Sequence, residues 1–108
     1  MAKIITTEEN LIEFSDGTRI TCDHEQDCCE QNYADCDQLD DLALGYNFNT
    51  SKLVFERVDG SGFRFGDRPE RMFFVPCYSV QNGYYSCDID VYLNGKLQIN
   101  LECEEVVD

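Results

Sequence analysis

Alternating apolar and polar residues, interrupted by short glycine-containing turns, dominate this chain. Asp-Gly and Asn-Gly turns between such runs favour β-hairpins, because the turn needs a positive φ that glycine tolerates. The pattern predicts a hairpin over residues 11–22, a second over residues 52–65 and a three-stranded meander over residues 71–104. Residues 66–70, which are polar and contain Gly and Pro, are expected to form a loop. The four turns are Ser15-Asp16-Gly17, Val58-Asp59-Gly60, Gln81-Asn82-Gly83 and Leu93-Asn94-Gly95.

The alternation also predicts the register of each hairpin. With a two-residue loop at Asn94-Gly95, Val91 would face the polar Gln98, whereas a three-residue loop with Gly95 in a bulge places Val91 opposite Leu97. Since a slip of one residue moves every side chain to the other face, the pattern favours the three-residue loop. The same rule at the other turns predicts these pairs: Ile12 with Ile20, Phe55 with Phe63, Val75 with Ile89, and Cys77 with Cys87.

Residues 25–45 lose this alternation and show helical spacing instead, with Gly45 as a stop signal. They are predicted to form one helix, or a short turn followed by a second helix that starts near Asp37. The predicted fold class is therefore α+β, in one domain over residues 1–108. An antiparallel sheet of hairpins and a C-terminal meander would have one face covered by this short acidic helical segment. The recurring positions are Cys29, Tyr33, Cys36 and Ala43.

A net charge of −14 on 108 residues narrows the range of partners. Residues 1–45 alone contain twelve carboxylates against Lys3 and Arg19. Such a surface repels nucleic-acid phosphates and favours basic partners, so direct nucleic-acid binding is disfavoured. Solubility is the alternative reason for the charge. The sequence shows neither a membrane-spanning apolar run nor a secretory h-region, and it predicts a cytoplasmic protein without membrane contact.

Residues 24–30 hold the only histidine, two adjacent cysteines and three carboxylates. His24 and Cys28 are four residues apart, and Cys36 follows two helical turns later, which is a spacing that zinc could use. Paired Cys-x-x-Cys ligands are absent, however. A thiol nucleophile at Cys28 or Cys29, activated by His24, is the other chemical reading. The surrounding carboxylates disfavour a thiolate, which argues against catalysis at these cysteines. No catalytic residue, metal or cofactor is therefore assigned. The seven cysteines are expected to be mostly buried free thiols.

Two stretches of the chain resemble a known family. His24-Glu25-Gln26-Asp27-Cys28-Cys29-Glu30 resembles the His-x-Gln-Asp-Cys-Cys-Glu signature of small uncharacterised proteins found mostly in bacteriophages and mobile elements. Asn82-Gly83-Tyr84-Tyr85-Ser86 resembles an Asn-Gly-Tyr-Tyr-Ser element of the same family. The resemblance implies a phage-type accessory protein in the host cytoplasm. It carries no established activity, and no catalytic role is transferred to His24 or Cys28.

The charge and the resemblance together favour a non-catalytic accessory protein that binds a host or phage protein. The expected partner is basic or binds nucleic acid. The alternative hypothesis is a small metal- or thiol-dependent enzyme or sensor built on His24, Cys28, Cys29 and Cys36. The oligomeric state stays open. The predicted interaction surface consists of Asp23, His24, Glu25, Asp27, Glu30, Asp35, Asp37, Asp40, Asp41 and Tyr84.

Overall fold

A computed structural model describes residues 1–23, 31–81 and 88–107, and the chain there folds almost entirely into strands. Strands account for 65% of residues and helices for about 11%, so the predicted α+β class is wrong and the protein is a mostly antiparallel β protein. The elements are β1 (Ile4–Glu8), β2 (Leu11–Phe14), β3 (Arg19–Asp23), β4 (Gln31–Ala34), η1 (Cys36–Gln38), α1 (Asp41–Leu44), η2 (Thr50–Lys52), β5 (Val54–Val58), β6 (Gly62–Arg68), β7 (Arg71–Gln81), β8 (Asp88–Leu93), β9 (Lys96–Glu102) and β10 (Glu104–Val107).

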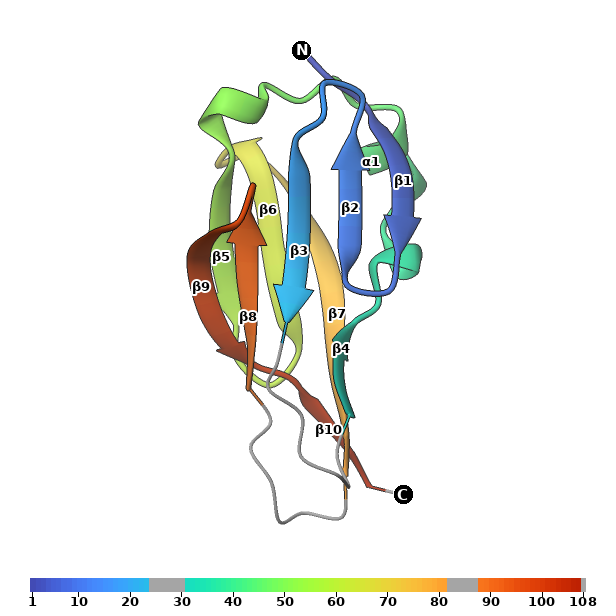
Figure 1. The fold of residues 1–108 in the computed structure, drawn as a ribbon, viewed down its shortest axis with the longest axis vertical. Coiled ribbons are helices and arrows are strands. Elements are labelled where there is room, and N and C mark those ends of the chain that lie inside the picture. Colours follow the sequence, from blue (N-terminus) through green and yellow to red (C-terminus); the bar gives the residue numbers. More distant parts are fainter. Residues whose placement is uncertain (24–30, 82–87, 108) are drawn as a thin grey trace.

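Two five-stranded sheets form two layers (Figure 1). The first sheet has the order β1-β2-β3-β8-β9, and in Figure 1 its strands β3 and β8 lie in front of the second sheet. The second sheet has the order β10-β7-β6-β5, with β4 also paired to β7. Residues 78–80 of β7 pair with antiparallel β4 and with parallel β10. Because one stretch of β7 serves both strands, β4 and β10 lie on opposite sides of it.

The core fills the space between the sheets, and Phe48 lies at its centre. This residue is 0% exposed and belongs to the segment between α1 and η2. Backbone hydrogen bonds with Ala2 fix it, at 2.9 Å from the Ala2 nitrogen and 2.7 Å from the Ala2 oxygen. Four aromatic rings surround Phe48 with centroids 4.7–5.6 Å away, so one side chain links both sheets. These rings belong to Phe14, Tyr46, Phe65 and Phe73.

Asn10 ties β4 to the first sheet. It has a positive φ of 65° at the turn between β1 and β2. Its backbone N–H donates to the Ala34 oxygen at 2.9 Å, and its side-chain oxygen accepts from the Ala34 nitrogen at 2.7 Å. The Asn10 carbonyl also accepts from the Cys22 nitrogen at 3.0 Å. The last strand residue of β4 is therefore fixed against β2 and β3 as well as β7.

The predicted registers hold for one hairpin and fail in detail for two. Ile12 faces Ile20, as the alternation predicts. In the second hairpin Phe55 faces Phe65 instead of Phe63, a shift of two residues that keeps the same side chains on the same face. The last hairpin has a two-residue turn with Asn94 and Gly95 at positive φ, together with a bulge in the register beyond Val91. The bulge keeps the apolar faces together: Val91 faces Ile99.

The expected loop over residues 66–70 is mostly strand. β6 runs to Arg68 and β7 starts at Arg71, with these two residues paired across the turn. A bulge lies between Phe65 and Arg68. Glycine at position 66 permits it, since a Cβ there would overlap the Arg71 carbonyl oxygen. The polar composition of residues 66–70 therefore did not indicate the end of β6, which depends on the close approach of the backbone at Gly66 and Arg71.

The predicted three-stranded meander is also wrong, because β7 and β8 belong to different sheets. Val75 pairs with Phe63 in the second sheet, whereas Ile89 pairs with Leu101 in the first. Both face the same core from opposite layers, and such strands show the same alternation as a hairpin. Cys77 lies opposite Ala34, and its predicted partner Cys87 lies outside the described residues.

The predicted helix over residues 25–45 is replaced, in its described part, by β4 and two short helical turns. Asn32 and Ala34 point into the protein while Tyr33 points outward, which is the two-residue period of a strand. The buried Asn32 concealed this period because it is polar. It donates to the Asp88 carbonyl at 2.9 Å and accepts from Ser79 Oγ at 2.5 Å, so its burial is supported by hydrogen bonds.

Candidate protein-binding surfaces

The outer side of the first sheet is an acidic surface. Inward residues such as Ile12, Ile20 and Ile89 are buried, so their neighbours along each strand point outward. In the described part of this sheet the strands contain only two basic residues, Arg19 and Lys96. We call the outward carboxylates the acidic sheet face: Glu8, Glu13, Asp23, Asp88, Asp90 and Glu102.

Like charges lie directly opposite each other on this face. Asp23 faces Asp90 across β3 and β8, and Asp88 faces Glu102 across β8 and β9. Asn100 reduces the repulsion, because its Nδ2 donates to Asp88 Oδ2 and to Asp90 Oδ1, both at 2.9 Å. The two adjoining pairs place four carboxylates close together on three strands.

The nearby carboxylates affect the pKa of Tyr92. Burial raises the pKa of its hydroxyl, and the Asp90 and Asp23 carboxylates raise that pKa further by disfavouring the phenolate. Tyr92 therefore lies close enough to the Asp90 and Asp23 carboxylates to be affected by their charge.

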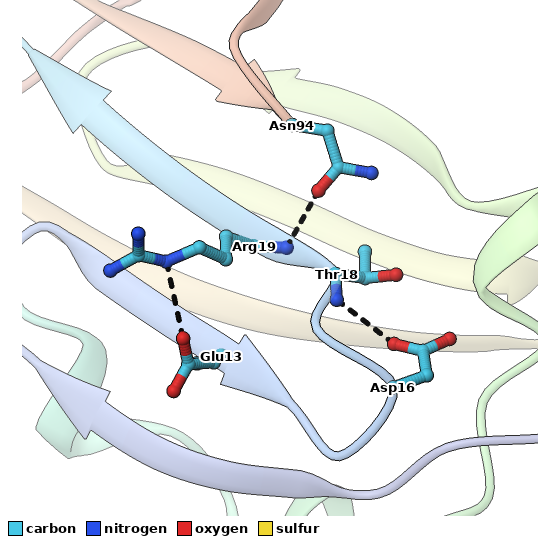
Figure 2. Close-up of polar contacts among 5 residues, drawn as sticks. All are labelled: Glu13, Asp16, Thr18, Arg19 and Asn94. Atoms are coloured by element: carbon cyan, nitrogen blue, oxygen red, sulfur yellow. Dashed lines mark hydrogen bonds and ion pairs between the residues drawn. The ribbon is translucent and has the colours of Figure 1, made fainter.

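The positive charges of this sheet lie at its other end. Figure 2 shows Arg19 beside Glu13, with Nε 3.2 Å from Oε2. The Arg19 backbone N–H donates to Asn94 Oδ1 at 2.9 Å, and Asn94 donates back to the Arg19 carbonyl at the same distance. Lys96 follows the same turn. The sheet is therefore polarised, with both basic residues near one pair of turns and Asp23, Asp88, Asp90 and Glu102 near the opposite ends of their strands.

A second surface combines tyrosines with carboxylates. Tyr33 of β4 faces Tyr78 of β7, with ring centroids 5.7 Å apart and planes inclined by 45°. Glu104 of β10 faces Tyr78 from the other side. Asp35 follows β4 directly, and Glu9 forms an isolated bridge with it. We call Glu9, Tyr33, Asp35, Tyr78 and Glu104 the tyrosine surface.

Hydrogen bonds from η1 organise this surface. Gln38 Nε2 donates to Asp35 Oδ2 at 2.6 Å, and the Tyr78 hydroxyl donates to Gln38 Oε1 at 3.5 Å. Burial raises the pKa of Tyr33, and the nearby carboxylates of Asp35 and Glu9 raise it further. Tyr33 therefore lies close to two carboxylates.

The structure divides the predicted interaction surface between elements. Asp23 belongs to the acidic sheet face, and Asp35 belongs to the tyrosine surface. Asp37 in η1 accepts from Thr7 Oγ1 at 3.3 Å. Asp40 caps α1 by accepting from the Leu42 nitrogen at 2.9 Å, and Asp41 is the first residue of that helix. The other predicted members lie outside the described residues: His24, Glu25, Asp27, Glu30 and Tyr84.

Several carboxylates of the acidic sheet face were absent from the predicted surface. The alternation around Ile89 and Val91 already indicated that Asp88 and Asp90 point away from the core. The missing information was that β8 pairs with β3, which brings Asp23 beside Asp90. Charge counting along the chain could not reveal this contact, because it arises from the pairing of distant strands.

The described cysteines are buried thiols and do not form a reactive site. Burial raises the pKa of Cys36 to about 12 and that of Cys22 well above its usual value. A hydrogen bond with Cys103, together with burial, raises the pKa of Cys77. Across the ranges that the structure covers, no three His, Cys, Asp or Glu side chains are arranged to hold a metal ion. The candidate metal residues His24, Cys28 and Cys29 lie outside these ranges.

A thiol titration tests this assignment. The native protein is expected to show no more than three fast-reacting thiols, because four of its seven cysteines are buried. All seven should react after unfolding in guanidinium chloride. The reaction with an aromatic disulfide reagent is followed by absorbance, and mass spectrometry locates the labelled residues. Fast native labelling of Cys22, Cys36, Cys77 or Cys103 would contradict the assignment.

No known protein suggests a function for this chain, so its function is inferred from its surfaces. Within the described ranges, no helix has the length and apolar character needed to cross a membrane. No family model matches this chain, and neither a curated protein nor a solved structure shows significant similarity to it.

Proposed function

We propose that the protein acts by binding a basic protein partner through the acidic sheet face, without catalysing a reaction. The observation that carries this proposal is the double like-charge pairing of Asp23 with Asp90 and of Asp88 with Glu102. Like charges directly opposite each other on a sheet are destabilising. A partner that brings lysines or arginines to this face meets four carboxylates gathered on three adjacent strands, which favours its binding there.

The overall charge supports the same class of partner. A net charge of −14 attracts cationic proteins over a distance and raises their association rate, with an effect that falls as salt increases. Proteins that bind nucleic acids are themselves basic, and a host or phage protein of that kind fits the accessory role that the resemblance implies. Nucleic acid itself is repelled by the same charge.

Two variants with the same charge test where the partner binds. The sheet-face variant combines Asp88→Asn, Asp90→Asn and Glu102→Gln, which keep the size of each side chain and one acceptor oxygen. The control variant combines Asp59→Asn, Glu70→Gln and Glu105→Gln at exposed positions outside the first sheet. Each variant removes three negative charges, so a difference between them reports position and not net charge.

Both variants and the original protein are immobilised and exposed to lysate at about 50 mM and about 300 mM salt, where screening is weak and strong. We expect the original protein and the control variant to retain the same basic proteins at low salt, identified by mass spectrometry. The sheet-face variant should lose most of them, and high salt should release them from all three. Equal retention by the two variants would contradict binding at the acidic sheet face.

A further inference from the structure

The tyrosine surface combines two aromatic rings with neighbouring carboxylates. Tyr33 and Tyr78 are both partly exposed. Asp35 lies two residues after Tyr33, so it points to the same side of the strand, and Glu104 faces Tyr78 in register. β4 and β10 contain no lysine or arginine, and β7 contains none after Arg71. The surface therefore has two features that attract a cation: π faces and carboxylates.

The strands that carry the two rings are held in place before any partner arrives. Asn10 fixes the end of β4 through two hydrogen bonds to Ala34. The buried Asn32 and Ser79 join β4 to β7 beside the tyrosines, with Ser79 Oγ donating at 2.5 Å. A platform that is ordered in the free protein loses little entropy on binding. This favours recognition of a single side chain over binding by adaptable loops.

Guanidinium suits this platform better than ammonium. It is planar, so it can stack on a tyrosine ring while its N–H groups donate to a carboxylate at the ring edge. An ammonium group is a compact, strongly hydrated charge and has no flat face to stack. Asp35 is placed to accept from such a group, since Gln38 holds its Oδ2 and leaves Oδ1 to other donors.

We propose that the tyrosine surface binds an arginine side chain of the partner, with the guanidinium stacked on Tyr33 and Tyr78 and hydrogen-bonded to Asp35. This inference rests on the proposed function in taking the partner to be a basic protein. It adds a second contact site and a preference between basic side chains. The acidic sheet face attracts positive charge of either kind, whereas the tyrosine surface selects arginine.

Short peptides test the preference. Three probes share a glycine-rich sequence and carry arginine, lysine or citrulline, the last being neutral and nearly the same shape as arginine. NMR titration follows the tyrosine ring signals of the intact protein. We expect the arginine peptide to bind at least about threefold more tightly than the lysine peptide, and the citrulline peptide to cause no saturable shift. Equal affinity for arginine and lysine would overturn the proposal.

Variants locate the contact. Tyr33→Phe with Tyr78→Phe keeps both rings and should keep the arginine preference, whereas Tyr33→Leu with Tyr78→Leu should abolish it. Asp35→Asn leaves the rings intact and should weaken arginine binding about threefold or more, so it tests the site even if the leucine variant is poorly folded. An arginine preference that survives both the leucine variant and Asp35→Asn would overturn the proposal.

The sheet-face variant separates this inference from the proposed function. It should keep the preference of the original protein for the arginine peptide over the lysine peptide, because the loss of sheet-face charge weakens both peptides alike and leaves the tyrosine surface unchanged. If the sheet-face variant retains every lysate partner while the leucine variant loses the arginine preference, only the proposed function fails. If the partners depend on the acidic sheet face but arginine and lysine bind equally, only the arginine site fails.

Discussion

Replacing Phe48 by alanine is expected to lower the free energy of unfolding by about 3–5 kcal/mol. The side chain is fully buried and contacts aromatic rings from both sheets and from Tyr46. Alanine would leave a cavity that these rings cannot close, since each is fixed by its own strand or by hydrogen bonds. Denaturation by urea, followed by circular dichroism, measures the change.

Phe74→Ala provides a matched control of the same residue type. Phe74 lies on the outer side of β7 and is 40% exposed. Its loss should cost about 1 kcal/mol or less, because little buried volume disappears. If Phe48→Ala costs no more than Phe74→Ala, Phe48 does not hold the two sheets together as described above.

Replacing Gly62 by alanine should also be severe, with a loss of at least about 2–3 kcal/mol. A Cβ at this position would overlap the Val75 carbonyl oxygen and lie 3.0 Å from the Cys77 nitrogen. Both atoms belong to the backbone of β7, which cannot rotate away as a side chain could. β6 and β7 would have to separate where Gly62 faces Pro76 and where Cys77 donates to the Ser61 carbonyl at 2.9 Å.

Gly45→Ala tests whether the loss at Gly62 comes from this contact. Gly45 ends α1 with a φ of −94°, and a Cβ there would have no atom within 4 Å. Alanine at this site should leave stability unchanged or raise it by up to about 1 kcal/mol, since it restricts the unfolded chain. Equal stability of the two alanine variants in urea would show that β6 and β7 do not approach as closely as the structure indicates.

Local alternation predicted which way most strand residues point. It placed Ile12 opposite Ile20 and put Asp88 and Asp90 on the side away from Ile89 and Val91. These predictions succeed because the two-residue period depends only on neighbouring residues along one strand. It survives even where the register shifts, as in the hairpin of β8 and β9.

The pairing of distant strands could not be predicted in the same way. β7 and β8 are consecutive along the described chain and alternate in the same manner, yet they belong to opposite layers. An apolar face packed against a facing sheet gives the same pattern as one shared across a hairpin. The error therefore concerned topology, while the inward direction of Val75 and Ile89 was predicted correctly.

The candidate surfaces depend on these distant pairings. Asp23 meets Asp90 only because β3 pairs with β8, and Tyr33 meets Tyr78 only because β4 pairs with β7. Residues around Tyr33 were predicted as helix because Asn32 points inward but is polar. An inward polar residue interrupts the alternation of apolar and polar residues that indicates a strand. The acidic character of the protein was visible in the sequence, but the faces that concentrate it were not.

The most direct measurement of binding at the acidic sheet face is the dissociation constant of one lysine-rich peptide for the two charge-matched variants. Isothermal titration calorimetry at about 50 mM salt keeps screening weak. We expect the sheet-face variant to bind at least about fivefold more weakly than the control variant, since it has lost three charges that lie together on the adjacent strands β8 and β9. Equal dissociation constants would show that only net charge matters and would contradict a partner site on the acidic sheet face.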